Sequence, residues 1–357
     1  YNFFYANYLI SKNNEEKTKK VIQTSLDQYP KNLILNQLKV DFEKRKLSNN
    51  KFDCKNLADV IAEILYITSN ALAVQNNYMI SNFYLNMAKY LNPNFVSYNA
   101  LYAENFVLIQ DYKKAIKIYN EMKKKGSVYS WHASKQISLI LIKQKKKEDA
   151  INSLKKSFEK IVNPTIYQMF DYAEFLKNNE VYEESIKYYS NVLKLIEAKN
   201  PLFAKVMDGR GVAYERTNNW QKGEKDLLSS LNATPNNAYV INYLAYSWIE
   251  KGINIEKSLD MLRKANKLKP NDGYIIDSLG WALFKLKKYK EAKKYLEIAI
   301  QYMASDPVVN DHYADSLWMN KKTIQARYYW NYVLKLSKTE EKLKKEIEKK
   351  LLFGLIS

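Results

Sequence analysis

The sequence predicts an all-α protein, a right-handed superhelical solenoid of about nine helical hairpins that ends in a C-terminal capping helix. Two observations predict this fold. Small residues recur with a period of about 34 residues, which is typical of a repeat made of two helices. Glycine and proline are scarce, at 8 and 7 of 357 residues, whereas an all-β chain needs many tight turns. A stack of this length is feasible because each unit packs only on its neighbours.

The small residues mark the points where the two helices of each hairpin cross closely, because bulky side chains do not fit there. In the first helices they are Ala6, Ser69, Ala103, Ser138, Ala173, Gly211, Ala245, Gly280 and Ala314. In the second helices they are Thr18, Ser81, Ala115, Ala150, Ser185, Gly223, Ser258, Ala292 and Ala326. The regular recurrence of these pairs predicts the nine hairpins.

Proline placement is an independent check of this repeat pattern. Proline inside a helix costs about 3 kcal/mol, so a helical array should confine it to the junctions. All prolines fall at junctions between the expected repeats, namely Pro30, Pro93, Pro164, Pro201, Pro235, Pro270 and Pro307.

The quality of the repeat pattern divides the chain into four segments. Residues 1–56 form an N-terminal hairpin followed by an insertion, which has a helical part and the polar loop SNNKFDCKN. Residues 57–203 hold degenerate repeats, residues 204–336 hold well-formed repeats, and residues 337–357 form the capping helix. The long step from Ala173 to Gly211 predicts a second helix lengthened by one turn, through Leu195 and Ile196.

Charge and cysteine usage limit the possible functions. The net charge of +19 fits either a polyanionic partner such as nucleic acid or the lysine-rich composition that an AT-rich genome produces. The single cysteine, Cys54, excludes a disulfide framework within one chain. We find no uninterrupted run of about 18 apolar residues and expect no transmembrane segment. Because the sequence starts at Tyr1 without methionine, it is either a fragment or a chain that has lost a leader.

Several blocks in the C-terminal half carry a family resemblance. They are GVAYER from Gly211 with Trp220 after it, NYLAYSWIEKG from Asn242, PNDGYIIDSLGWAL from Pro270 and NDHYADSLW from Asn310. They resemble the conserved blocks of tetratricopeptide repeat (TPR) proteins of alphaproteobacterial type, closely over 204–336 and more loosely over 57–203. The resemblance implies a bacterial scaffold of the cell envelope, periplasmic or associated with the outer membrane. A cytoplasmic location is the alternative.

Candidate binding residues follow from helical spacing, which places the second, fifth, ninth and twelfth residues of each first helix on one face. The fifth residue is polar in four successive repeats, and these residues are Asp208, Asn242, Asp277 and Asp311. One interpretation is a ladder in a concave groove that bonds the backbone of an extended peptide. The alternative is that each residue is solvated or locally paired on a helix flank.

Aromatic residues gather on the same face, and aromatic side chains with polar tips are common binding anchors. They are Tyr239, Tyr246, Tyr274, Trp281, Phe284 and Trp318. Packing between adjacent hairpins is the alternative role. For Trp281 and Phe284 the groove is favoured, and we expect Trp281→Ala or Asp277→Lys to weaken partner capture without unfolding the chain.

Catalytic patterns are absent from the sequence. His132 and His312 are the only histidines, no HExxH, Walker or GxGxxG motif occurs, and Ser316 near His312 lacks an acyl-enzyme motif. We therefore expect no enzyme, no cofactor and no metal site. The predicted function is a protein–protein interaction scaffold or adaptor that holds a partner segment in the groove. The alternative is nucleic-acid binding through the basic surface, although acidic groove positions would repel phosphate.

Overall fold

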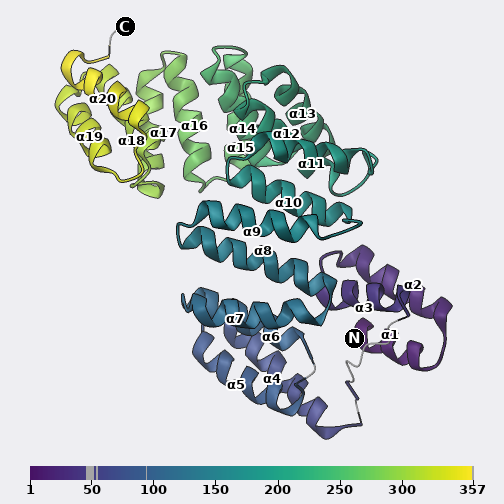
Figure 1. The fold of residues 1–357 in the computed structure, drawn as a ribbon. Coiled ribbons are helices and arrows are strands. Elements are labelled where there is room, and N and C mark those ends of the chain that lie inside the picture. Colours follow the sequence, from purple (N-terminus) through teal and green to yellow (C-terminus); the bar gives the residue numbers. More distant parts are fainter. Residues whose placement is uncertain (46–51, 54, 94, 356–357) are drawn as a thin grey trace. The chain divides into compact units, whose positions relative to one another are not determined.

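The computed structural model describes residues 1–45, 52–53, 55–93 and 95–355, and all regular structure within these residues is helical (Figure 1). This confirms the all-α prediction. The chain divides into two compact units, Tyr1–Gln168 and Met169–Ser357, and each is described by itself. The segment boundaries predicted after residues 56, 203 and 336 mark changes in repeat regularity, which the two units do not test.

The first unit holds four helical hairpins, a separate helix and a short 3-10 turn. Its elements are α1 Asn2–Ser11, α2 Glu15–Gln28, α3 Leu33–Glu43, α4 Leu57–Val74, α5 Tyr78–Leu91, α6 Ser97–Leu108, α7 Tyr112–Met122, η1 Lys123–Lys125, α8 Ser127–Lys143 and α9 Lys147–Glu159. The separate helix α3 is the predicted helical part of the insertion. It packs against α8, where the Val128 backbone N–H donates to Gln37 Oε1 at 2.9 Å. Much of the predicted polar loop, including Cys54, lies outside the described residues.

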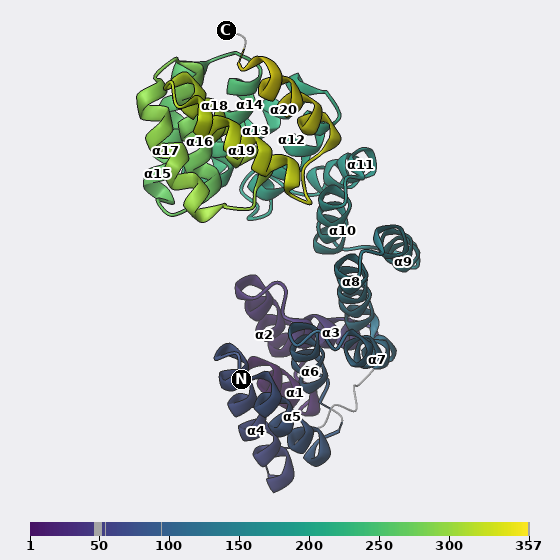
Figure 2. The same cartoon turned by 90° about the vertical axis from the view of Figure 1, so that its left-hand side faces the viewer.

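The second unit holds five hairpins and a final single helix. Its elements are α10 Ile166–Asn178, which begins just before the division, α11 Tyr182–Leu193, α12 Phe203–Arg216, α13 Trp220–Ala233, α14 Ala238–Glu250, α15 Ile255–Leu268, α16 Gly273–Lys285, α17 Tyr289–Tyr302, α18 Pro307–Met319, α19 Thr323–Lys335 and α20 Glu341–Phe353. Figure 2 shows α20 lying against α19. The buried Ile347 of α20 packs into the apolar cluster of the last hairpins, as expected for a capping helix.

The predicted crossing residues are buried in every described hairpin. Two crossings show why small residues are required. A Cβ added at Gly280 would lie 2.6 Å from Leu296 Cγ, and a Cβ added at Gly223 would lie 2.8 Å from the carbonyl oxygen of Gly211. Side chains at these points would therefore push the two helices of the hairpin apart.

The hairpin turns share a backbone feature that the sequence pattern did not predict. Each of the nine described turns contains a non-glycine residue with positive φ, the left-handed conformation that commonly ends helices. These residues are Asn13, Asn76, Gln110, Lys145, Glu180, Asn218, Asn254, Lys287 and Lys321. A side chain in this conformation costs about 1–2 kcal/mol, and the packing of the hairpins outweighs that cost at every turn.

One expectation about helix length needs correction. The second helix α11 ends at Leu193, so the residues expected to lengthen it, Leu195 and Ile196, lie in the connection to α12. That connection contains Pro201, and the Asn200 side chain accepts a hydrogen bond from the Leu202 backbone N–H at 2.9 Å. The extra residues of this step therefore lengthen the connection before α12 and not the helix α11.

One helix, α4, bears on the expectation of no transmembrane segment. This 18-residue helix has a mean hydropathy of 1.5, so its length and composition alone would allow it to cross a membrane. In the structure α4 forms a hairpin with α5, and the Ser81 hydroxyl donates to the Ser69 carbonyl oxygen at 2.8 Å across their crossing. Only 17% of this helix is buried.

Candidate functional site

The predicted binding residues lie on α12, α14, α16 and α18, the first helices of four successive hairpins in the second unit. We call this surface the first-helix face. Its most exposed members are Tyr239 and Tyr274, at 57% and 55% exposure. Asp277, Trp281 and Asp311 are buried, with at most 8% of each residue exposed. The partly buried members are Asp208, Asn242, Tyr246, Phe284 and Trp318.

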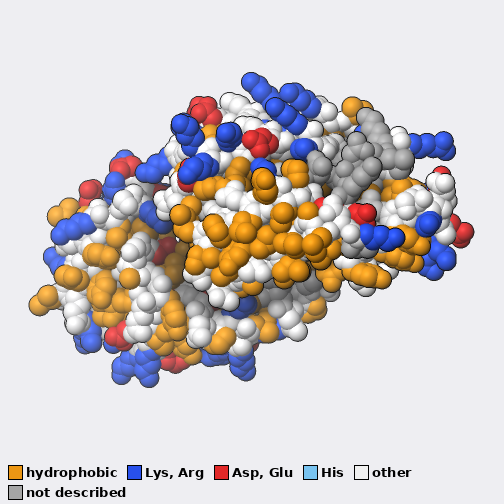
Figure 3. Space-filling model, turned by 90° about the horizontal axis from the view of Figure 1, so that it is seen from below, with side chains coloured by type: hydrophobic (Ala, Val, Ile, Leu, Met, Phe, Trp, Pro, Cys, Tyr) orange, Lys and Arg blue, Asp and Glu red, His pale blue; other side chains and the backbone are white. Residues whose placement is uncertain are grey.

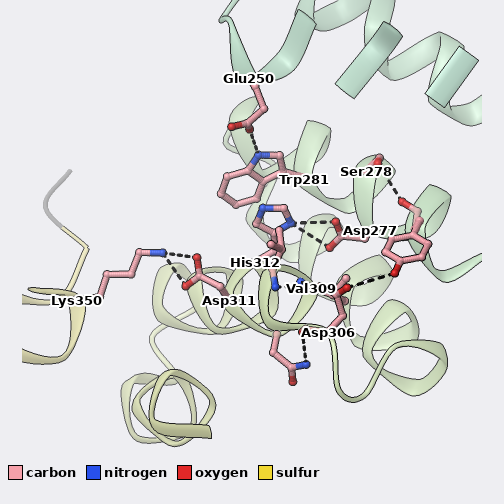
Figure 4. A network of polar contacts seen from close by, with 12 residues as sticks. Glu250, Asp277, Ser278, Trp281, Asp306, Val309, Asp311, His312 and Lys350 are labelled. Carbon is pink, nitrogen blue, oxygen red and sulfur yellow. Dashed lines mark hydrogen bonds and ion pairs between the residues drawn. The ribbon is translucent and has the colours of Figure 1, made fainter. Parts of the chain in front are cut away.

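Asp277 is part of a buried stack between two successive first helices (Figure 4). Its two carboxylate oxygens each lie 3.0 Å from Nδ1 of His312, which belongs to α18. The His312 ring stacks on Trp281 with 3.9 Å between ring centroids, and Trp281 stacks in turn on Phe284 at 4.8 Å. The indole N–H of Trp281 donates to Glu250 of α14 at 2.6 Å. The stack therefore joins three successive hairpins.

Asp311 has an internal cation partner as well. The Lys350 Nζ, from α20, lies 2.7 and 2.8 Å from the Asp311 carboxylate oxygens and 2.9 and 2.8 Å from those of Asp315. The Trp330 indole N–H donates to Asp315 at 3.0 Å. One lysine thus holds two buried carboxylates of α18 and ties the capping helix to the end of the first-helix face.

Burial and neighbouring charges shift the pKa values of this network. Burial alone would lower the pKa of His312, because it opposes the charged form. The adjacent Asp277 carboxylate and its hydrogen bond outweigh burial, and Asp311 and Asp315 add to their effect, so the pKa of His312 is raised. Burial, reinforced by the charge of Asp311, raises the pKa of Asp315 to about 7 despite Lys350. The gathering of Asp277, Asp311 and Asp315 around His312 and Lys350 thus shifts the pKa values of His312 and Asp315 upward.

The remaining fifth-position residues lie in different surroundings. Burial raises the pKa of Asp208 to about 6, with Lys177 opposing the shift and Glu174 adding to it. The buried Oδ1 atom of Asn242 accepts no hydrogen bond from the residues that the structure describes. The four residues of the predicted ladder are therefore not equivalent, and their role in partner binding stays a prediction.

Each exposed tyrosine has one polar neighbour. The Tyr274 hydroxyl donates to Asp306 Oδ2 at 3.4 Å, and the Lys269 Nζ lies 5.7 Å from the ring centroid of Tyr239. Trp318 instead packs into the last hairpin, with its ring centroid 5.4 Å from that of Trp330 and a Cβ added at Gly354 only 2.1 Å from its ring. Tyr246 packs beside the His312 stack.

The burial of Asp277 and Trp281 corrects one expectation. Asp277→Lys would place a second cation against His312, and Trp281→Ala would open a cavity under that ring, so both changes should destabilise the fold. A change in partner capture by such variants would not isolate binding. The sequence pattern had placed both residues on the correct helix but had not identified His312 or Glu250 as their partners.

A hollow in the first unit was not predicted from the sequence. Its volume is about 1610 Å³, and residues of α1, α2 and α3 line it, among them Phe4, Lys19 and Phe42. Its walls mix aromatic, amide and charged side chains from three helices. The pattern of small crossing residues describes contacts within hairpins and carries no information about this region.

Comparisons with known proteins agree with the repeat geometry. The family model described as a tetratricopeptide repeat matches residues 97–339. The chain belongs to the tetratricopeptide repeat family. TPR proteins are generally scaffolds for protein–protein interaction and are typically non-enzymatic. Among the residues that the structure describes, no group of three or more His, Cys, Asp or Glu side chains is placed to hold a metal ion.

A curated relative and two solved TPR structures are similar to this chain. A TPR repeat-containing protein of Pseudomonas aeruginosa is 28% identical over 162 residues, which are 45% of this chain and 27% of the relative. The chain therefore spans well under two thirds of that relative. A TPR protein of Parabacteroides merdae is 16% identical, with 61% of this chain and 86% of that one covered and a TM-score of 0.48. A thermophilic TPR protein of Thermus thermophilus is 14% identical, with 53% and 100% covered and a TM-score of 0.45.

Proposed function

We propose that this TPR chain is a scaffold or adaptor that holds a segment of a partner protein on the first-helix face of its second unit. The observation that carries the proposal is the pair Tyr239 and Tyr274. They occupy the same position of successive first helices, and more than half of each is exposed. Exposed tyrosines bring large contact areas at low conformational cost, and such residues often dominate binding energy.

The buried stack on the same first helices supports the proposal because several contacts order its side chains. The His312 ring is fixed by Asp277 on its edge and by Trp281 on its face. A surface whose side chains are already ordered loses little entropy when a partner binds. We infer that an extended partner segment packs its apolar side chains on the tyrosines, with the buried stack remaining intact.

The proposal includes a location in the cell envelope, periplasmic or at the outer membrane. Its support is the resemblance of the blocks between Gly211 and Trp318 to alphaproteobacterial TPR scaffolds. Detection of the chain by immunoblot in the periplasmic or outer-membrane fraction of its host is the expected result. Recovery in the cytoplasmic fraction alone would contradict this part of the proposal and leave the binding surface to be tested separately.

The experiment is an affinity capture from the lysate of a related bacterium with three versions of the chain. The test variant is Tyr239→Ala/Tyr274→Ala. The matched control is Tyr302→Ala/Tyr328→Ala, whose tyrosines are 51% and 69% exposed but lie on the second helices α17 and α19. Circular dichroism checks that all three chains fold. Because exposed tyrosines contribute little to folding, both variants should melt close to the native chain.

The expected result is a defined protein that the native chain and the control retain and the test variant loses. With that protein purified, the test variant should bind it at least about tenfold more weakly, since each tyrosine truncation at a binding hot spot costs more than about 1 kcal/mol. Equal capture by all three chains would refute the surface assignment. Salt-sensitive capture of nucleic acid alone would favour the alternative function through the basic surface.

A further inference from the structure

The helix α4 presents an apolar seam to solvent in the first unit. Its residues follow alternating steps of three and four, the spacing by which helices pack along one stripe: Leu57, Val60, Ile64, Ile67, Ala71 and Val74. Leu57, Ile64, Ile67 and Val74 are 71%, 58%, 60% and 84% exposed. Figure 3 shows a broad hydrophobic area on the face that holds α4 and α5, with lysines and arginines at its edges.

The equivalent seam is buried in other first helices because a second helix covers it. In α16 the residues equivalent to Ile64, Ile67 and Ala71 are Ile275, Ser278 and Ala282, with at most 4% exposed, and α15 packs against that helix. In α18 the seam is likewise buried, and α17 packs against it. The element before α4 is instead α3, which packs on α8. The seam of α4 is therefore a packing face of a repeat, whereas exposed end faces of repeat stacks are normally polar.

The charge pattern identifies the kind of surface that fits. Between Leu57 and Val74 there is no lysine or arginine, and the two acidic residues, Asp59 and Glu63, lie off the seam. A helix that lies on an anionic membrane carries basic residues beside its apolar face. The basic residues at the edges in Figure 3 come from other elements, because α4 itself has none, so the composition of α4 favours a neutral helix over an anionic lipid surface. A neutral apolar seam fits another neutral apolar helix.

The seam is complementary to itself when reversed. About its midpoint, Leu57 corresponds to Val74, Val60 to Ala71 and Ile64 to Ile67, so an antiparallel copy of α4 pairs an apolar residue with an apolar residue throughout. Antiparallel packing is also the arrangement in the rest of the stack, because consecutive helices joined by short turns run in opposite directions. Two-fold pairing of identical surfaces is the commonest form of protein oligomer.

We propose that this chain forms a homodimer in which α4 packs antiparallel against α4 of a second copy. The helix α5, which packs against α4, also exposes apolar side chains, namely Met79, Ile80, Phe83 and Met87. The one lysine of α5, Lys89, lies 3.8 Å from Glu121, so its charge is locally balanced. The interface uses residues of the first unit and none of the first-helix face.

The test measures the mass in solution of the full chain and of two variants. The disrupting variant is Ile64→Glu/Ile67→Glu. The matched control is Ile324→Glu/Tyr328→Glu, which changes two residues of α19 that are 85% and 69% exposed. Sedimentation equilibrium should give twice 42.0 kDa for the native chain and the control. The disrupting variant should sediment as a monomer, with dimerisation weakened on the order of 100-fold or more by the buried carboxylates.

Several outcomes would overturn the proposal. A native chain that stays monomeric up to about 100 µM would do so, since a specific dimer is expected to associate well below that concentration. A dimer that survives in the disrupting variant would place the interface elsewhere. Binding of a monomeric native chain to phosphatidylserine vesicles, lost in the disrupting variant, would assign the seam to lipid instead. Circular dichroism checks that each variant folds. If the disrupting variant still captures the partner protein, a failure of the dimer proposal leaves the function proposed above unaffected.

The antiparallel arrangement has its own test. In a Cys54→Ser background, chains carrying Leu57→Cys are mixed with chains carrying Val74→Cys and oxidised. Antiparallel helices place these two positions opposite each other, so the expected disulfide joins one chain of each kind. Disulfides that form only between identical chains would overturn the proposed geometry.

Discussion

Replacing Lys350 with methionine tests how firmly α20 is fastened to the last hairpin. The side chain of Lys350 is 18% exposed and its Nζ lies within 2.7 to 2.9 Å of the carboxylate oxygens of Asp311 and Asp315. Methionine keeps the apolar stem but leaves both buried carboxylates without their cation. Breaking a buried ion pair from one side costs about 3–5 kcal/mol. We expect the lower end, about 3 kcal/mol, because Asp315, whose pKa is raised to about 7, takes up a proton readily.

The assay is amide hydrogen exchange, because the ends of repeat stacks open locally. A loss of about 3 kcal/mol corresponds to roughly a hundredfold lower protection of the α20 amides at about pH 8. The loss should be smaller at about pH 5.5, where protonation of Asp315 removes one unpaired charge. The control is Lys344→Met, whose partner Glu341 is 79% exposed, so its effect should stay below about 0.5 kcal/mol. Equal effects of the two substitutions would refute the reasoning.

Three further changes test the packing, the turns and the electrostatics in urea or thermal unfolding. Gly223→Ala should lower the free energy of unfolding by about 2 kcal/mol, because the new Cβ would lie 2.8 Å from the Gly211 carbonyl oxygen; an unchanged midpoint would contradict this. Lys321→Gly should raise the free energy of unfolding by about 1 kcal/mol, because φ is 63° at this turn and glycine adopts that conformation without strain. A lower midpoint would disprove this expectation. Burial raises the pKa of Asp208 to about 6 in the folded chain, whereas an aspartate in the unfolded chain has a pKa of about 4. Between these pH values the folded chain therefore binds more protons than the unfolded chain. Stability should therefore fall as pH rises between these values, and Asp208→Asn should flatten that part of the curve.

The part of the fold that the sequence predicted is the part that local spacing determines. Each hairpin closes on its own small residues, so Gly280 and its equivalents could be recognised without knowledge of distant contacts. The prolines indicated the same boundaries between hairpins, because proline is unfavourable inside a helix. Spacing also placed Tyr239, Tyr274 and Asp277 on one face of successive helices. What it could not give was their exposure, which depends on whether a neighbouring hairpin contributes a covering side chain.

The features that the sequence did not predict arise from contacts between helices that are distant in the chain. His312 lies 35 residues from Asp277, and Lys350 lies 39 residues from Asp311. Neither partner can be identified from the pattern within one helix. The docking of α3 on α8 spans 91 residues between Gln37 and Val128. Because α3 docks there, the apolar face of α4 stays uncovered, which the repeat pattern within residues 57–203 did not indicate.

The recurrence of acidic residues at the fifth position of the first helices has an explanation within the fold. Asp277 pairs with His312, which comes from the next first helix, and Asp311 pairs with Lys350, which comes from α20. Within the stack the partner of the aspartate comes from the next repeat. At the end of the stack the capping helix provides that partner. A partner segment that bonded to these carboxylates would have to displace buried cations and break contacts between repeats. A segment that packs on Tyr239 and Tyr274 breaks none, so we expect aromatic contacts, and not a carboxylate ladder, to provide the binding energy of the first-helix face.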